Sequence, residues 1–153
     1  MDTPQGQSKQ TKQTAGWREW AALPELGVSR IKAKLDTGAR TSCLHAFYTR
    51  TYEHNGEPWL EFHLHPNQGD EETVLICQAP IVDQRNVTDS GGHVENRPVI
   101  LTPMQLGGDL WPIEMTITNR DTMKFRMLIG RTAMRGRLLI DSDSSYLLGE
   151  PQP

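Results

Sequence analysis

Apolar and polar residues alternate in short stretches along most of the chain. In residues 29–35, Ile31, Ala33 and Leu35 fall on one side and basic residues on the other, as in a half-buried strand. Residues 131–135 have room for one helical turn, which Gly136 would end. Other strands are predicted at 17–23, 41–52, 59–65, 74–82, 81–87, 94–101, 111–118, 125–129 and 137–140. The pattern therefore predicts an all-β sandwich or barrel with one short helix.

Turn residues link several of these strands into hairpins. The first two strands are expected to pair across a turn at 25–28, and Asn55-Gly56 is a strong signal for a second hairpin. A longer hairpin has arms at 81–87 and 94–101. Its tip, residues 88–93, contains paired glycines that leave the backbone loose.

Length and composition predict one compact domain. The chain has 153 residues, of which 36% are hydrophobic, and we expect a folded domain at 16–150 after a disordered tail at 1–15. A net charge of −3 gives no general attraction to nucleic acid, and no apolar run is long enough for a membrane helix. Because the polar first residues do not resemble a secretory signal, a cytoplasmic protein is expected, with Cys43 and Cys77 as buried thiols.

A carboxylate follows the strand at 29–35. Asp36 begins a turn with Thr37, Gly38, Ala39 and Arg40. Gly38 permits a close backbone approach that a side chain would block, and the Thr37 hydroxyl can bond locally. Such a turn is suited to present Asp36 to a cleft.

The residues Ala33-Lys34-Leu35-Asp36-Thr37-Gly38-Ala39, together with Met127-Leu128-Ile129-Gly130-Arg131, resemble the retropepsin-like aspartic peptidases. A closer resemblance, which also includes the stretches 23–27 and 97–100 and covers most of 16–148, is to a bacterial group named ATP-dependent zinc proteases. The resemblance implies a closed or partly open acid-protease-like barrel, a single lobe with one short helix.

In that family two neighbouring aspartates share a proton and activate a water that attacks a peptide carbonyl. This chain has one such motif, so the resemblance implies a homodimer with Asp36 from each protomer at the two-fold axis. Thr37 would brace the two turns and Gly38 would meet the substrate through its backbone. The resemblance implies that the hairpin tip closes over an extended peptide as a flap. The implied substrate-binding residues are Ala39, Arg40, Ser90, Gly91, Gly92, Ile129, Gly130 and Arg131.

Arg40 departs from the retropepsin pattern, which has an acidic residue at this position, whereas Arg131 is kept. Guanidinium groups bind carboxylates with bidentate geometry, so these arginines, with Arg135 and Arg137 nearby, favour an acidic peptide unless they are solvated surface charges. The bacterial group is often associated with ATP-grasp glutamate ligases. Glutamate-extended protein tails are therefore a concrete substrate hypothesis.

The sequence contains neither the phosphate-binding glycine loop that is typical of ATP sites nor the His-Glu-x-x-His helix that is typical of zinc peptidases. No cofactor and no metal are predicted. The remaining candidates for metal ligands are Cys43 with His45, His63 with His65, and the single residues Cys77 and His93. The acidic cluster 141–144 is expected to be a turn, although in a monomer it would be the first place to seek a second carboxylate.

Two other function classes stay open. One is a β-barrel that binds peptides or a partner enzyme without catalysis. The other is a zinc-dependent peptidase.

Overall fold

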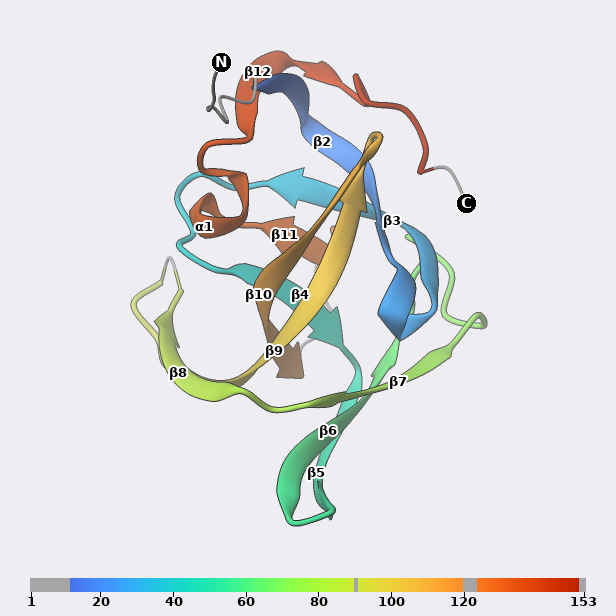
Figure 1. Cartoon of the computed structure of the whole chain (residues 1–153), viewed down its shortest axis with the longest axis vertical. Coiled ribbons are helices and arrows are strands. Elements are labelled where there is room, and N and C mark those ends of the chain that lie inside the picture. Colours follow the sequence, from blue (N-terminus) through green and yellow to red (C-terminus); the bar gives the residue numbers. More distant parts are fainter. Residues whose placement is uncertain (1–11, 90, 120–123, 152–153) are drawn as a thin grey trace, which may run out of the picture.

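The computed structural model describes residues 12–89, 91–119 and 124–151, and it is built almost entirely of strands (Figure 1). The elements in chain order are β2 (Gln13–Leu23), the 3-10 turn η1 (Pro24–Leu26), β3 (Val28–Leu35), β4 (Ser42–Ala46), β5 (Tyr48–His54), β6 (Glu57–Leu64), β7 (Leu75–Pro80), β8 (Asp83–Thr88), β9 (Val94–Leu106), β10 (Asp109–Asn119), β11 (Met127–Ile129), α1 (Arg131–Met134) and β12 (Leu138–Ser145). The predicted all-β class with one short helix is confirmed.

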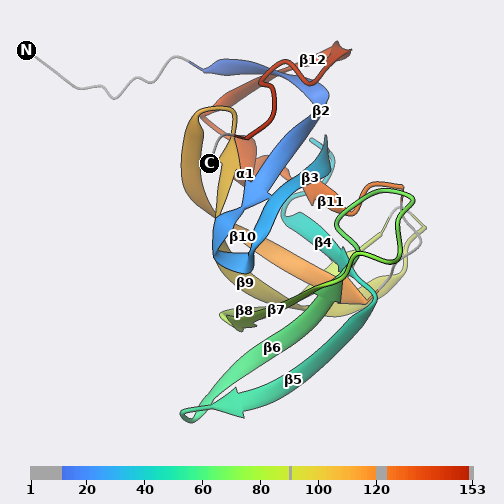
Figure 2. The same cartoon turned by 90° about the vertical axis from the view of Figure 1, so that its right-hand side faces the viewer.

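The strands form an eight-stranded sheet in the order β12-β2-β3-β11-β4-β10-β9-β8. An additional pairing of β2 with β9, at Ala21 opposite Leu106, closes the central strands into a ring. Strands β12 and β8 lie outside this closure, so the ring is not a clean barrel. Strands β5, β6 and β7 make a separate sheet, of which the β5–β6 hairpin projects from the body (Figures 1 and 2).

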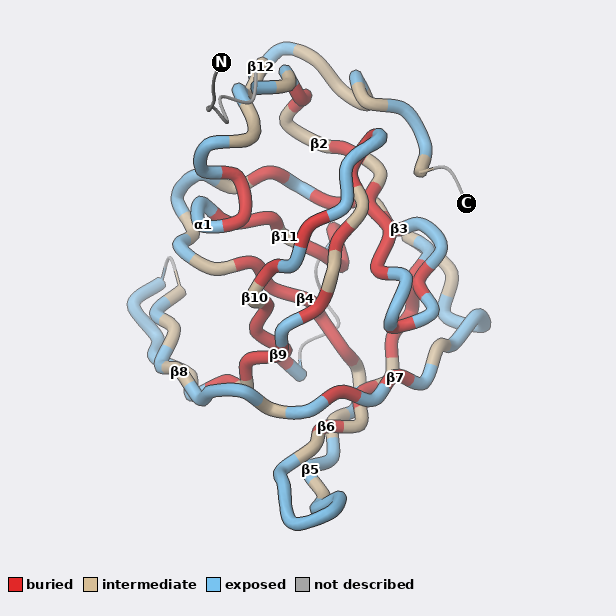
Figure 3. Tube along the Cα trace, in the orientation of Figure 1, coloured by how far each residue is buried: buried red, intermediate tan, exposed pale blue. Residues whose placement is uncertain are grey.

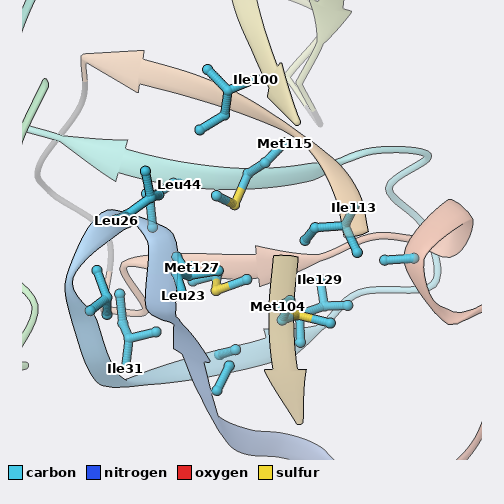
Figure 4. Close-up of a cluster of buried hydrophobic side chains, with 14 of the residues drawn as sticks. Leu23, Leu26, Ile31, Leu44, Ile100, Met104, Ile113, Met115, Met127 and Ile129 are labelled. Carbon is cyan, nitrogen blue, oxygen red and sulfur yellow. The ribbon is translucent and has the colours of Figure 1, made fainter. Parts of the chain in front are cut away.

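Apolar side chains fill the inside of the ring. Strand β3 shows why: Ile31, Ala33 and Leu35 are buried at alternate positions, as the sequence pattern predicts. Leucine, isoleucine and methionine side chains from β2, β3, β4, β9, β10 and β11 meet in this core (Figure 4). Figure 3 marks the buried positions of the chain in red. Their burial supplies most of the driving force for closing the ring.

The stretch 41–52 was predicted as one strand, and the structure shows that this prediction is wrong. It forms two strands, β4 and β5, which separate at Phe47 and belong to different sheets. Strand β4 is buried at every position because it lies between β10 and β11, whereas β5 is mostly exposed and pairs only with β6 among the described strands. Alternation within one segment does not reveal this change of partner.

The first and last strands pair in parallel, which extends the folded part of the chain at its start. Strand β2 begins at Gln13, three residues before the expected boundary at Gly16, because Leu138 to Asp141 of β12 lie opposite Gln13 to Gly16. Ala15 is fully buried as a result. Residues 1–11 of the expected tail lie outside the described residues.

The buried carboxylate of Glu19 fixes the end of the chain to β2. Its oxygens accept hydrogen bonds from the backbone N–H of Gly16 at 2.7 Å, of Leu147 at 2.8 Å and of Leu148 at 3.1 Å. A fully buried carboxylate is stable when backbone donors satisfy it, so Glu19 has a structural role in the described fold. Within the described residues, no helix is long and apolar enough to span a bilayer.

Candidate functional site

The Asp36 turn follows β3 at the point where that strand pairs in parallel with β11. The Asp36 backbone N–H donates to the Ile129 carbonyl at 2.8 Å, and its side-chain Oδ1 accepts from the Gly38 N–H at 3.0 Å. The Asp36 carbonyl accepts from the Ala39 N–H at 3.2 Å. Asp36 is half-buried, and Thr37 and Gly38 are exposed. The turn therefore presents its carboxylate at the surface on a fixed backbone.

The second motif braces the turn from behind. Arg131 donates from its backbone N–H to the Ala39 carbonyl at 2.8 Å, and its guanidinium donates to the carbonyls of Thr37 at 3.2 Å and Gly38 at 3.3 Å. The predicted proximity of the two motifs is what the structure shows. Ile129, one of the predicted substrate-binding residues, is fully buried, and its side chain packs in the core behind the turn.

Gly130 allows this close approach. A Cβ at this position would lie 2.6 Å from the Thr41 carbonyl carbon and 2.9 Å from the Ser42 nitrogen, both of them backbone atoms. The Gly130 N–H donates to the buried Ser42 Oγ at 3.0 Å, and the Thr116 hydroxyl donates to the Ser42 carbonyl at 3.2 Å. The glycine is therefore required by packing against β4.

Arg40 is exposed at the end of the turn and lies within electrostatic reach of Glu114 on β10. Glu114 accepts a hydrogen bond from Arg85 of β8 at 2.8 Å, and Arg85 also donates to Asp83 at 2.8 Å. The hydrogen bond from Arg85 lowers the pKa of Glu114, and the pKa of Asp83 falls for the same reason. Ion pairs thus connect β8 to β10 across the intervening strand β9.

The long hairpin forms as predicted, from β8 and the first part of β9. At its tip the Asp89 side chain accepts hydrogen bonds from the backbone N–H of Gly91 and of His93, both at 2.9 Å. Gly92 has φ +87°, a conformation that favours glycine. Gly91 and Gly92 are exposed, and Ser90, another predicted substrate-binding residue, lies outside the described residues.

A polar group that the sequence did not single out lies on the opposite side of the sheet from the core. We call it the Arg97 cluster; its members are Cys43, Glu95, Arg97 and Thr118. Arg97 donates from Nε to Glu95 at 2.8 Å and from Nη1 to the Cys43 sulfur at 3.3 Å. Arg97 is only 7% exposed. Alternation along β9 places Arg97 on the same side as Val99. The structure shows that both residues are buried, which the sequence pattern does not indicate for an arginine.

The candidate metal ligands stay apart. His63 lies 2.7 Å from Glu61, and the His65 ring stacks on Phe47. Cys43 and Cys77 are reduced and buried, as predicted, and burial raises the pKa of the Cys77 thiol to about 11. Among residues 12–89, 91–119 and 124–151, no three His, Cys, Asp or Glu side chains are arranged to hold a metal ion. Within these described residues the donor set does not fit a zinc peptidase.

The acidic cluster 141–144 belongs to β12, where the register with β2 shifts between Asp141 and Ser145. The Asp141 carboxylate accepts from the Asp143 N–H at 3.0 Å and from the Ser144 hydroxyl at 2.9 Å. These hydrogen bonds lower its pKa. The expected turn is thus an irregularity within strand β12. The Asp141 carboxylate accepts its hydrogen bonds from residues of this same irregularity.

Known proteins resemble the chain both in sequence and in fold. It is 49% identical to a probable alpha-L-glutamate ligase of Shewanella pealeana and 47% identical to one of Desulfotalea psychrophila, over 88% and 91% of this chain. The chain spans about 30% of the length of these relatives. A crystal structure of a Legionella pneumophila protein of unknown function superposes with a TM-score of 0.75 at 25% identity, over 90% of this chain and 99% of that one.

The family model described as "Retropepsin-like aspartic endopeptidase RimB" matches residues 14–151, which include both motifs of the candidate site and nearly all of the described fold. The resemblance found in the sequence is therefore confirmed, and the chain belongs to the RimB-like family of retropepsin-like proteins.

Proposed function

We propose that this protein is an aspartic endopeptidase that acts as a homodimer, with one Asp36 from each protomer forming the catalytic pair. The observation that carries the proposal is the fixed Asp36 turn, which Ile129 holds through its backbone carbonyl and Arg131 through its backbone N–H and its guanidinium. Backbone anchoring keeps a carboxylate in one position without occupying its oxygens fully. The family match supports the same reading.

In the proposed reaction two Asp36 carboxylates share one proton, because two like charges a hydrogen bond apart do not both ionise. The ionised carboxylate takes a proton from a water molecule, which attacks the peptide carbonyl. The protonated carboxyl donates to the carbonyl oxygen. Collapse of the tetrahedral intermediate breaks the C–N bond, and the amine leaves with a proton from the pair.

We propose an acidic peptide as substrate. Arg40 is exposed next to the turn, and Arg131 contributes a guanidinium to the turn itself. Relatives that contain a region like this chain are named glutamate ligases, which supports a link to glutamate-extended tails and to the enzyme that makes them. The hairpin of β8 and β9 would cover such an extended peptide.

Substitution of Asp36 tests the proposal. We expect Asp36→Asn to reduce kcat by at least about 1000-fold on a Glu-rich peptide, because the substitution removes the shared proton. Asp141→Asn is the matched control, because it removes a carboxylate from the irregular part of β12. This variant should cleave the peptide as the unmodified protein does. Peptide cleavage is followed by mass spectrometry and the oligomeric state by light scattering.

A protein that binds peptides without cleaving them is the second candidate, because the named relatives are ligases and not peptidases. Full cleavage by Asp36→Asn, or a monomer that cleaves peptides at every concentration, would contradict the dimeric aspartic mechanism. Peptide binding without cleavage by the unmodified dimer would favour the second candidate.

A further inference from the structure

The Arg97 cluster is a buried polar group in a position that strands usually fill with apolar residues. Cys43, Arg97 and Thr118 have exposures of 5%, 7% and 1%. Removing a guanidinium from water is costly unless its donors are satisfied, so such an arrangement has to be built by specific partners.

Those partners fix the orientation of the guanidinium. Glu95 accepts from Arg97 Nε at 2.8 Å and is itself held by the Thr118 hydroxyl, at 3.1 Å and 3.0 Å from its two oxygens. Arg97 Nη1 points to the Cys43 sulfur at 3.3 Å. A thiol is a weak acceptor, so this edge of the guanidinium makes only a weak contact within the protein.

A chain of contacts connects the cluster to the Asp36 turn. Cys43 lies opposite Leu128 in the β4–β11 pairing, and its neighbour Ser42 binds the Gly130 N–H. Gly130 follows Ile129, whose carbonyl accepts from the Asp36 N–H. Strand β11 thus lies between β4, which carries Cys43, and β3, which leads into the Asp36 turn.

Arg97 is also part of the hairpin that would cover a peptide. It lies on β9 directly opposite Arg85 of β8, in the arms that lead to the glycine tip. Movement of this hairpin would carry Arg97 with it. Opening of the hairpin would move Arg97 away from Cys43 on β4, and closure would bring the guanidinium onto a bound peptide.

We infer that Arg97 determines specificity by binding the carboxylate of an acidic substrate side chain in a subsite next to Cys43. The inference rests on the proposed peptidase function and adds the residue that selects the side chain. Glu95 and Thr118 act as positioning residues that hold the guanidinium in its fork geometry. A carboxylate would replace the weak thiol contact with charge-assisted hydrogen bonds.

The test compares a peptide that contains Glu residues with a second peptide in which every Glu is replaced by Gln. We expect the unmodified protein to favour the Glu peptide in kcat/KM, and Arg97→Gln to reduce this ratio by about 10- to 100-fold. Arg85→Gln is the matched control, because Arg85 lies opposite Arg97 but has a side chain 31% exposed, against 9% for Arg97. It should leave the ratio unchanged.

Two additions keep the result interpretable. The Glu95→Gln/Arg97→Gln double variant keeps the net charge and avoids an unpaired, partly exposed carboxylate if Arg97→Gln alone does not fold. Binding of the same two peptides to Asp36→Asn, measured by fluorescence anisotropy, gives the preference without catalysis. We expect the Asp36→Asn protein to prefer the Glu peptide, and the preference to disappear when Arg97 is also changed.

The outcomes separate the inference from the proposed function. A Glu preference in binding that survives the loss of Arg97 overturns the inference, whether or not the protein cleaves peptides. Equal binding of both peptides by the Asp36→Asn protein overturns it too. A chain that cleaves no peptide but loses its Glu preference with Arg97 supports the subsite and contradicts the peptidase function.

Discussion

The Asp36 turn and the β8–β9 hairpin would lie on the two sides of a bound peptide, but they are held in different ways. Backbone hydrogen bonds and the close contact at Gly130 fix the turn, and Ser42, Ile129 and Gly130 behind it are buried. The hairpin is held by the β8–β9 pairing, by the contact of Arg97 with Cys43, and by ion pairs such as Arg85 with Glu114, whose side chains are 31% and 43% exposed. Buried backbone contacts specify one geometry, whereas exposed ion pairs contribute little stability and allow movement. A fixed turn opposite a hairpin that can move would suit the water activation and peptide entry that we propose.

The largest effect should come from filling the space at Gly130. We expect Gly130→Ala to lower the free energy of unfolding by about 3 kcal/mol, because its Cβ would meet the backbone at 2.6 Å and the strands must move apart. Gly108→Ala is the matched control, since nothing lies within 4 Å of a Cβ there. Urea denaturation measures both. Equal stability of the two variants would show that the turn is not rigid.

A smaller effect is expected when one hydrogen bond is removed behind the turn. Ser42→Ala leaves the buried Gly130 N–H without its acceptor at 3.0 Å, and a lost partner of this kind costs about 1–3 kcal/mol. The control is Ser29→Ala at an exposed position of β3. Activity should fall together with stability, because the same contact positions Asp36; a fall in stability with unchanged activity would separate the two.

The smallest effect should be at the hairpin. Glu114→Gln is expected to cost less than about 1 kcal/mol at pH 7, since the Arg85 pair is partly exposed. The pKa of Glu114 is lowered from 4.5, so its contribution is present above that value and is lost as the pH falls through the lower folded-state pKa. Urea midpoints of the variant and the parent should therefore differ at pH 7 and converge at strongly acidic pH. A difference that persists in acid would mean that charge is not the cause.

The same contrast explains how much of the molecule the sequence could predict. Asp36 and Gly130 stand in local patterns with defined turn requirements, so both motifs and their proximity were predictable from the family resemblance. The division of 41–52 at Phe47 was not, because the choice between two sheets depends on which strands lie alongside. The burial of Arg97 was not predictable either. An arginine in an alternating strand is expected to face solvent, and only the positions of Cys43 and Glu95 explain why it does not.

The Asp36 turn also has a consequence for when the site can form. The Arg131 guanidinium and the Thr37 carbonyl that it binds are 94 positions apart in the chain, and Ser42 and Gly130 are 88 apart. Contacts of such long sequence separation form late and slowly, since the entropy of closing the loop has to be overcome first. During synthesis the Asp36 carboxylate would therefore have no fixed geometry until Arg131 has left the ribosome. The proposed catalytic pair could therefore form only after both motifs have been synthesised.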